Sequence, residues 1–153
     1  MTPLIFLASA SPTRIAMLEN AGVPFTPQAA RIDELAVKQA MLAEGAKPRD
    51  VADALAEMKA QRISAKNPGA LVIGSDQVAE LNGTLLSKPE NLTEARAQLI
   101  SLRNQEHKLL SAVVIVKDGQ PQWRHVGQAR LWMRDFSDTF LTAYLDRLGN
   151  DAT

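Results

Sequence analysis

The fold is decided by the stretch Leu7-Ala8-Ser9-Ala10-Ser11-Pro12-Thr13-Arg14, which joins an apolar run to a helix start. The residues just before it, Leu4-Ile5-Phe6-Leu7, are continuously apolar, which is typical of a strand buried on both faces. Ser11 followed by Pro12 indicates a helix start, because the hydroxyl caps the first turn and proline fits its first position. We therefore predict a strand, a short serine-rich loop and a helix, with the loop at the helix N-terminus.

A helix start of this kind attracts anions. Free backbone N–H groups and the helix dipole favour negative charge at this end. The hydroxyls of Ser9 and Ser11 add donors, and the planar guanidinium of Arg14 matches a phosphate group. The alternative is an ordinary capped helix with an exposed arginine, since Ser-Pro caps are common. The local pattern leaves both interpretations open.

The composition limits the class of protein. The chain has 153 residues, of which 46% are hydrophobic and 22% charged, and its formal net charge is zero. These values suit one globular domain and argue against a protein that coats nucleic acid. The chain has no cysteine and two histidines, which excludes thiolate and histidine-rich metal sites. Any metal must then be held by carboxylates, which favours a hard ion such as Mg²⁺.

No apolar run approaches the length of a membrane span, and the first apolar run lacks the basic residues of a signal peptide. We therefore expect a cytoplasmic protein with no membrane partner.

Helical and strand patterns follow one another along the chain without a repeat or a linker. The predicted elements are a strand at 23–27, a loop at 29–35, a helix at 48–63, a strand at 70–74, a hairpin at 80–86, a helix at 93–100 capped by Thr93, strands at 108–117 and 122–133, and a helix from Ser137.

Two carboxylate motifs are candidates for chemistry. Asp33-Glu34 falls in the predicted loop at 29–35, where adjacent carboxylates bind Mg²⁺ or act as general bases, unless they are merely a solvated pair. Asp76 follows an apolar strand, and ligands of open α/β sheets collect at strand ends, although a turn aspartate fits equally. Lys59 and Lys88 have the charge to contact a triphosphate, but each alone also fits an ordinary surface lysine.

In this order, the motifs resemble those of the Maf family of nucleoside triphosphate pyrophosphatases. The opening stretch at 7–14 is similar to the family's L-A-S-x-S-P-x-R signature, and Asp33-Glu34 to its D-E pair. Lys59-Ala60 is similar to its K-A element, Gly74-Ser75-Asp76-Gln77-Val78 to the motif with the catalytic aspartate, and Lys88-Pro89 to the next motif. The resemblance covers nearly the whole chain and depends on the ordered set.

The resemblance implies an α/β fold with a mixed, curved sheet, flanking helices and a deep cleft. It also implies a cytoplasmic homodimer that uses Mg²⁺ or Mn²⁺ to cleave a nucleoside triphosphate into a nucleoside monophosphate and pyrophosphate. Asp76 would accept the proton of the attacking water and would bind the metal together with Glu34. The substrate-binding residues would be Ser9, Ser11, Arg14, Lys59 and Lys88.

Thr13 and Gln77 stand at positions that the family associates with base choice. The form Gly-Ser-Asp-Gln resembles the branch that acts on 7-methyl-GTP, although that branch often has an aromatic residue at the position of Thr13.

The family normally continues beyond this length, so we expect 1–153 to be a single Maf-like domain without the usual C-terminal segment. The alternatives are a truncated, catalytically weak or inactive nucleotide-binding homologue with a regulatory role in cell division, which the family's association with septum formation suggests, and a nucleic-acid-binding module, which the zero net charge disfavours.

Overall fold

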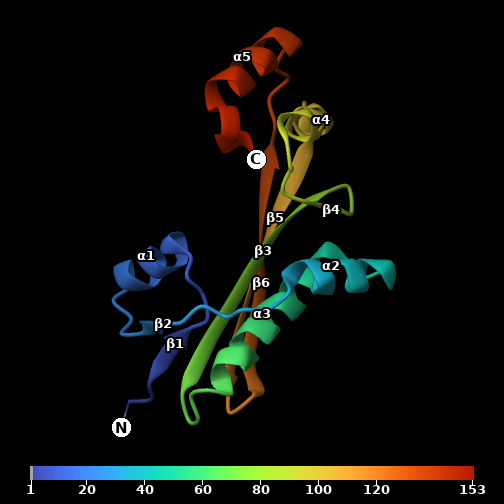
Figure 1. Cartoon of the computed structure of the whole chain (residues 1–153). Coiled ribbons are helices and arrows are strands. Elements are labelled where there is room, and N and C mark those ends of the chain that lie inside the picture. Colours follow the sequence, from blue (N-terminus) through green and yellow to red (C-terminus); the bar gives the residue numbers. More distant parts are fainter. Residues whose placement is uncertain (1) are drawn as a thin grey trace. The chain divides into compact units, whose positions relative to one another are not determined.

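The computed structural model describes residues 2–153 and forms one mixed sheet with helices (Figure 1). The sheet order is β2-β1-β3-β5-β6, and β4 pairs with β3. β1 runs parallel to β2 and to β3, whereas β4 is antiparallel to β3, so the predicted α/β class is confirmed. The elements are β1 (Ile5–Leu7), α1 (Pro12–Asn20), β2 (Thr26–Pro27), α2 (Glu34–Ala43), α3 (Pro48–Ser64), β3 (Leu71–Leu81), β4 (Thr84–Leu86), α4 (Leu92–Leu102), β5 (Glu106–Lys117), β6 (Gln120–Trp132), α5 (Asp138–Leu148) and the 3-10 helix η1 (Gly149–Ala152).

The chain divides into two compact units. The first comprises Met1–Val78 and Leu110–Gly127, and the second comprises Ala79–Leu109 and Gln128–Thr153. The strands β3, β5 and β6 contribute residues to both units. The single domain expected from the sequence stays a prediction.

The first unit is built around the buried face of α3. Val51, Leu55 and Ile63 recur at helical spacing and are fully buried, as expected for a helix that packs on a sheet. Gly74 of β3 lies directly against this helix, because a Cβ added there would be 2.0 Å from the carbonyl oxygen of Ala56. The backbones of α3 and β3 therefore approach more closely than a residue with a side chain at position 74 would allow.

The N-terminal junction has the predicted form. β1 ends at Leu7, and the side chain of Ser11 caps α1 by accepting a hydrogen bond from the backbone N–H of Arg14. Gly22, just after the helix, has a positive φ of 70°, which a glycine adopts without strain. The parallel register pairs Leu7 with Ile73, so the serine-rich loop begins beside the N-terminal part of β3, just before Asp76.

The second unit has a smaller apolar core. Ala95 of α4 is buried together with Leu141 and Leu145 of α5. The predicted hairpin turn at Asn82-Gly83 is confirmed, with positive φ values of 49° and 82°. The side chain of Ser137 caps α5, which confirms the predicted start of the last helix.

The prediction that Asp33-Glu34 lies in a loop is wrong. Oδ1 of Asp33 accepts a hydrogen bond from the backbone N–H of Ala36 at 3.0 Å, which makes Asp33 the N-cap of α2. Glu34 is the first residue of this helix, where its negative charge interacts favourably with the helix dipole.

Two other predicted boundaries are also wrong. The strand predicted at 70–74 does not end at the following polar residues, because the alternating burial of β3 continues to Val78 and the strand to Leu81, which places Asp76 inside the strand. The cap of α4 is Asn91 rather than Thr93, since the Asn91 side chain accepts the hydrogen bond from the backbone N–H of Glu94. A polar residue by itself therefore does not determine where a strand ends or which residue caps a helix.

We expect Gly74→Ala to lower the free energy of unfolding by about 1–3 kcal/mol, because overpacking against a helix backbone is not relieved by a change of rotamer. Urea denaturation measures the effect. Gly127→Ala is the matched control, because an added Cβ on that β6 glycine has its nearest neighbours 3.9 Å away. A Gly74→Ala variant as stable as the control would contradict the close contact between α3 and β3.

Candidate active site

Lys59 of α3 lies between carboxylates from two other elements. Its Nζ donates a hydrogen bond to Oδ1 of Asp76 in β3 at 2.8 Å and lies 2.9 Å from Oε1 of Glu34 at the start of α2. Lys59 is 7% exposed and Asp76 is 4% exposed, whereas the Glu34 side chain is 42% exposed. The structure therefore brings three predicted site residues together as a buried ion pair with a solvent-facing carboxylate beside it.

The second oxygen of Asp76 is also buried. This atom, Oδ2, has no hydrogen-bond partner in the part of the chain that the structure describes. A buried polar atom normally has a partner, because removing it from water without one is unfavourable. Lys59 supplies one positive charge to two carboxylates, so the cluster carries a formal excess of one negative charge. Asp76 is thus placed to receive a proton or a further cation.

The sequence explains why these groups meet. Lys59 belongs to the stripe of α3 that faces the sheet, between the fully buried residues Ala56 and Ala60. Gly74 and Asp76 are two residues apart in β3 and therefore point to the same face of the strand. Because Gly74 lets α3 approach β3, the lysine reaches the aspartate at hydrogen-bonding distance.

The serine-rich loop also forms a hydrogen-bonded group. Nη1 of Arg14 donates to Oγ of Ser9 at 3.4 Å, and the backbone N–H of Ser11 donates to the same oxygen at 3.1 Å. Ser9 is 8% exposed, so its hydroxyl is held in place, while Arg14 is half-buried. The pairing of Leu7 with Ile73 brings this loop next to the part of β3 that leads to the buried aspartate. The guanidinium, the hydroxyls and the N-terminus of α1 are thus arranged on one short segment.

The remaining predicted site residues lie on the surface. Thr13 is exposed on the first turn of α1. Gln77 is exposed and points to the face of β3 opposite to that of Asp76. Lys88 is exposed in the loop after β4, in the second unit. Their roles in base choice and phosphate binding stay predictions.

A divalent metal ion fits the carboxylate cluster in part. Within residues 2–153, no three His, Asp or Glu side chains are close enough to hold a metal ion by themselves. Glu34 and Asp76 nevertheless offer hard oxygen donors, including the unpartnered Oδ2 of Asp76. Mg²⁺ commonly binds through one or two carboxylates together with substrate phosphates. The residues therefore fit a metal whose other ligands are phosphate oxygens and water.

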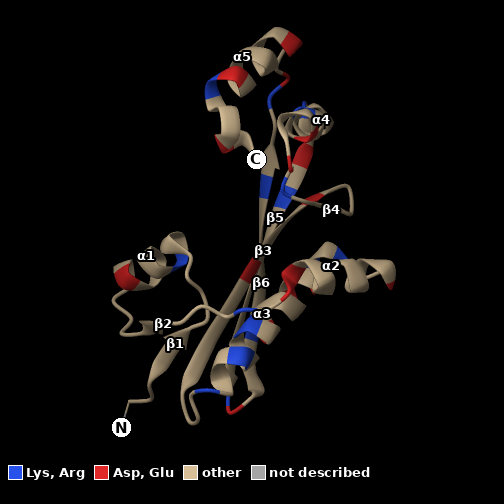
Figure 2. Ribbon diagram, viewed as in Figure 1, with Lys and Arg blue, Asp and Glu red and all other residues tan. Residues whose placement is uncertain are grey.

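A second charged cluster links β6 to α3. The guanidinium of Arg124 contacts Asp53 at 2.6 Å and Glu57 at 2.7 Å, two residues on successive turns of α3. The hydrogen bonds with Glu57 and then Asp53 raise the pKa of Arg124. Figure 2 shows charged residues of both signs along this helix. The partners are about 70 residues apart in sequence, so no local pattern predicts the contact, which we interpret as structural.

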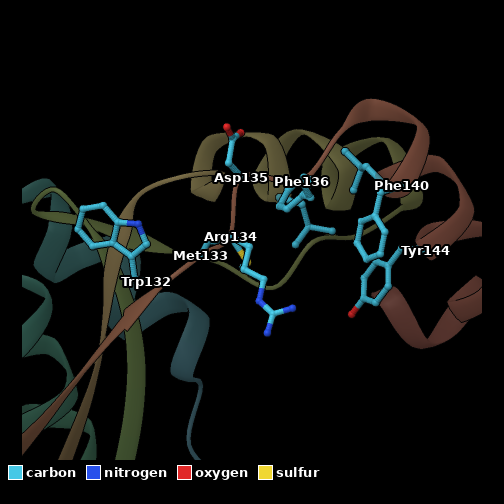
Figure 3. Close-up of a pocket in the computed structure, with 9 residues that line it drawn as sticks. Trp132, Met133, Arg134, Asp135, Phe136, Phe140 and Tyr144 are labelled. Atoms are coloured by element: carbon cyan, nitrogen blue, oxygen red, sulfur yellow. The ribbon is translucent and has the colours of Figure 1, made fainter.

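The second unit has a cavity of its own. Its volume is about 640 Å³, and Figure 3 shows the side chains around it. The rings of Phe140 and Tyr144 stack on one side with their centroids 6.0 Å apart. Trp132 at the edge of the cavity is 67% exposed. The lining is mainly apolar and includes none of the predicted site residues: Leu99, Trp132, Met133, Arg134, Asp135, Phe136, Phe140, Leu141 and Tyr144.

A family model described as Maf-like protein matches residues 4–152. The chain belongs to the Maf family. Curated relatives include the nucleoside triphosphate pyrophosphatases of Ruegeria pomeroyi, 56% identical over 96% of this chain and 74% of that protein, and of Roseobacter denitrificans, 59% identical over 95% and 72%. The 7-methyl-GTP pyrophosphatase of Brucella abortus is 46% identical over 99% of this chain and 76% of that protein. The resemblance seen in the sequence is confirmed.

Solved structures agree with the fold of this Maf-family chain. A HAM1 protein from Coxiella burnetii superposes with a TM-score of 0.56 at 13% identity, covering 86% of this chain and 71% of that one. A nucleoside-triphosphatase, or dITP/XTP pyrophosphatase, from Mycobacterium abscessus gives 0.50 at 19% identity, covering 82% and 71%. At these identities the likeness concerns the fold alone.

No helix in residues 2–153 is long and apolar enough to cross a membrane.

The buried ion pair generates a prediction about stability. Lys59→Met should lower the free energy of unfolding by about 3–5 kcal/mol, because it leaves the buried Asp76 without its counter-ion. The double variant Lys59→Met/Asp76→Asn should be more stable than Lys59→Met alone, since it removes the uncompensated charge. Glu34→Gln should change stability by less than about 1 kcal/mol, because Glu34 is solvated. Urea denaturation of the four proteins measures these differences, and a double variant less stable than Lys59→Met would contradict the pairing.

Proposed function

We propose that this chain is a metal-dependent nucleoside triphosphate pyrophosphatase, which converts a nucleoside triphosphate and water into a nucleoside monophosphate and pyrophosphate. The observation that carries the proposal is the cluster of Lys59, Asp76 and Glu34 at β3, the strand that pairs with β1, from which the Ser9–Arg14 loop continues. The names of the curated relatives support the same activity. These names support a hydrolase, and the dependence on a metal is part of our proposal.

The serine-rich loop suits the binding of the phosphate chain. The guanidinium of Arg14 and the hydroxyl of Ser9 already lie within hydrogen-bonding distance of each other and would share a phosphate oxygen. The backbone N–H groups at the start of α1 add donors and the positive end of the helix dipole. Lys88 would add a further positive charge. Binding here would neutralise the charge that pyrophosphate gains as it leaves.

Asp76 suits the role of general base. Its buried, unpartnered Oδ2 would accept a proton from a water molecule as the water oxygen bonds to the α-phosphorus. The bond between the α-phosphorus and the bridging oxygen then breaks, and pyrophosphate leaves with that oxygen. A Mg²⁺ or Mn²⁺ ion held by Glu34 and Asp76 would supply charge neutralisation and Lewis acidity.

The preferred base is proposed from the relatives and from two surface residues. One group of relatives is named for nucleoside triphosphates in general and another for 7-methyl-GTP. Gln77 follows the family pattern of the 7-methyl-GTP branch, whereas Thr13 departs from it, so a modified purine nucleotide is the first substrate to test.

The cytoplasmic location and the homodimer rest on the family resemblance alone. The retained Lys59, Asp76 and Glu34 make an inactive regulator of septum formation the weaker alternative.

A panel of canonical and modified triphosphates tests the activity. We expect the chain with Mg²⁺ or Mn²⁺ to release pyrophosphate, and we expect EDTA to abolish this release, because the two carboxylates are themselves negative and the metal has to offset the charge of the phosphates. Pyrophosphate release and thermal unfolding with each nucleotide are measured in parallel. Nucleotides that raise the unfolding temperature without any pyrophosphate release would contradict the enzyme and favour the binding-only homologue.

The role of Asp76 has its own test. Asp76→Asn should lower the rate constant for pyrophosphate release by roughly 10²–10⁴-fold, the usual contribution of a general base, while nucleotide binding persists. Asp146→Asn, at an exposed position of α5, is the matched control and should keep the wild-type rate. Steady-state kinetics and isothermal titration calorimetry give the rate and the binding. An Asp76→Asn variant with the control's rate would show that another group accepts the proton.

A further inference from the structure

Lys59 occupies the position of a cation between the two carboxylates that the proposed function assigns to the metal. Its Nζ is 2.8 Å from Oδ1 of Asp76 and 2.9 Å from Oε1 of Glu34. These distances are those of direct ion pairs, and the ammonium group is almost completely buried. One oxygen of each carboxylate is therefore already paired with the same positive charge, which belongs to the protein.

This arrangement disfavours a bare divalent ion. An ion bound to both carboxylates would lie within a few ångströms of the ammonium group, and like charges at such distances repel strongly where water is excluded. The described chain offers no third His, Asp or Glu ligand to compensate for the repulsion. Two carboxylates that share a lysine are thus a poor site for Mg²⁺ or Mn²⁺ alone.

A polyphosphate would remove both obstacles to metal binding, the repulsion by the ammonium group and the lack of further ligands. Its oxygens are acceptors for the lysine ammonium, which sits on a flexible side chain and can exchange one partner for another. Once Lys59 bonds to phosphate, Oδ1 of Asp76 and Oε1 of Glu34 become available as ligands. The same phosphate supplies the additional oxygens that the coordination of Mg²⁺ requires.

We propose that Lys59 is an internal counter-ion that excludes divalent metal from the carboxylates until a polyphosphate draws its ammonium group away. Metal and polyphosphate then bind with positive coupling, and each raises the affinity for the other by the same factor. The inference rests on the proposed function for the identity of the metal ligands. It adds the order in which the site is filled and makes Lys59 a sensor of the substrate's phosphates.

Protein-bound Mn²⁺ is measured by the enhancement of water-proton relaxation, which distinguishes it from Mn²⁺ bound to free triphosphate. The wild-type chain is titrated with Mn²⁺ alone and with Mn²⁺ and inorganic triphosphate. Lys59→Met removes the charge and Lys59→Arg retains it. Lys66→Met, at an exposed position after α3, is the control for loss of a lysine charge elsewhere. Thermal unfolding with and without Mn²⁺ checks that each variant is folded, and Lys59→Gln replaces Lys59→Met if that variant does not fold.

We expect the wild-type chain, Lys66→Met and Lys59→Arg to bind Mn²⁺ at least about tenfold more weakly without triphosphate than with it, within the usual range of coupling between sites. Lys59→Met should bind Mn²⁺ alone at least about tenfold more tightly than wild type, and Mn²⁺ should raise its unfolding temperature. Equal Mn²⁺ affinities of wild type and Lys59→Met would overturn the proposal, as would wild-type binding of Mn²⁺ that triphosphate does not strengthen.

Pyrophosphate release from nucleotides, measured on the same wild-type sample, separates this inference from the proposed function. Release together with equal Mn²⁺ affinities overturns the counter-ion role alone. The expected pattern of Mn²⁺ binding without any release supports the counter-ion role and overturns the enzyme activity.

Discussion

The hydrogen bond between Lys59 and Asp76 is the interaction on which the rest of the first unit depends. A buried ion pair is tolerated only when both charges are compensated at close distance, so α3 has to lie directly on β3. Gly74 permits this approach because it has no side chain where the backbone of α3 passes. The start of α2 then places Glu34 beside the same lysine. This contact thus links the packing of α3 on β3 to the charges of the candidate site.

The parts of the structure that local sequence chemistry decides were predictable. The strand and helix around Ser11-Pro12 and the turn at Asn82-Gly83 follow from side-chain capping and from positive φ angles. The start of α2 was missed, because Asp33-Glu34 alone does not distinguish a cap from a loop. The length of β3 was missed because a buried aspartate inside a strand is rare without a partner, and that partner lies on another element.

The candidate site was predictable as a set of residues but not as a geometry. The ordered motifs identify Lys59, Asp76 and Glu34, yet the sequence assigns the lysine to phosphate and the carboxylates to metal. The structure places the ammonium group of Lys59 in contact with both carboxylates. Lys59 and Asp76 are 17 positions apart in the sequence, so only the packing of α3 on β3 reveals the pair. In the counter-ion role that we propose for Lys59, this contact would connect substrate binding and metal binding in this Maf-family chain.

The most direct test of the account is hydrolysis of a nucleoside triphosphate in water enriched in ¹⁸O. If Asp76 activates a water that attacks the α-phosphorus, one ¹⁸O atom should appear in the phosphate of the nucleoside monophosphate, and the pyrophosphate should remain unlabelled. Mass spectrometry of both products distinguishes these positions. Label in the pyrophosphate, or release of orthophosphate in place of pyrophosphate, would contradict the account.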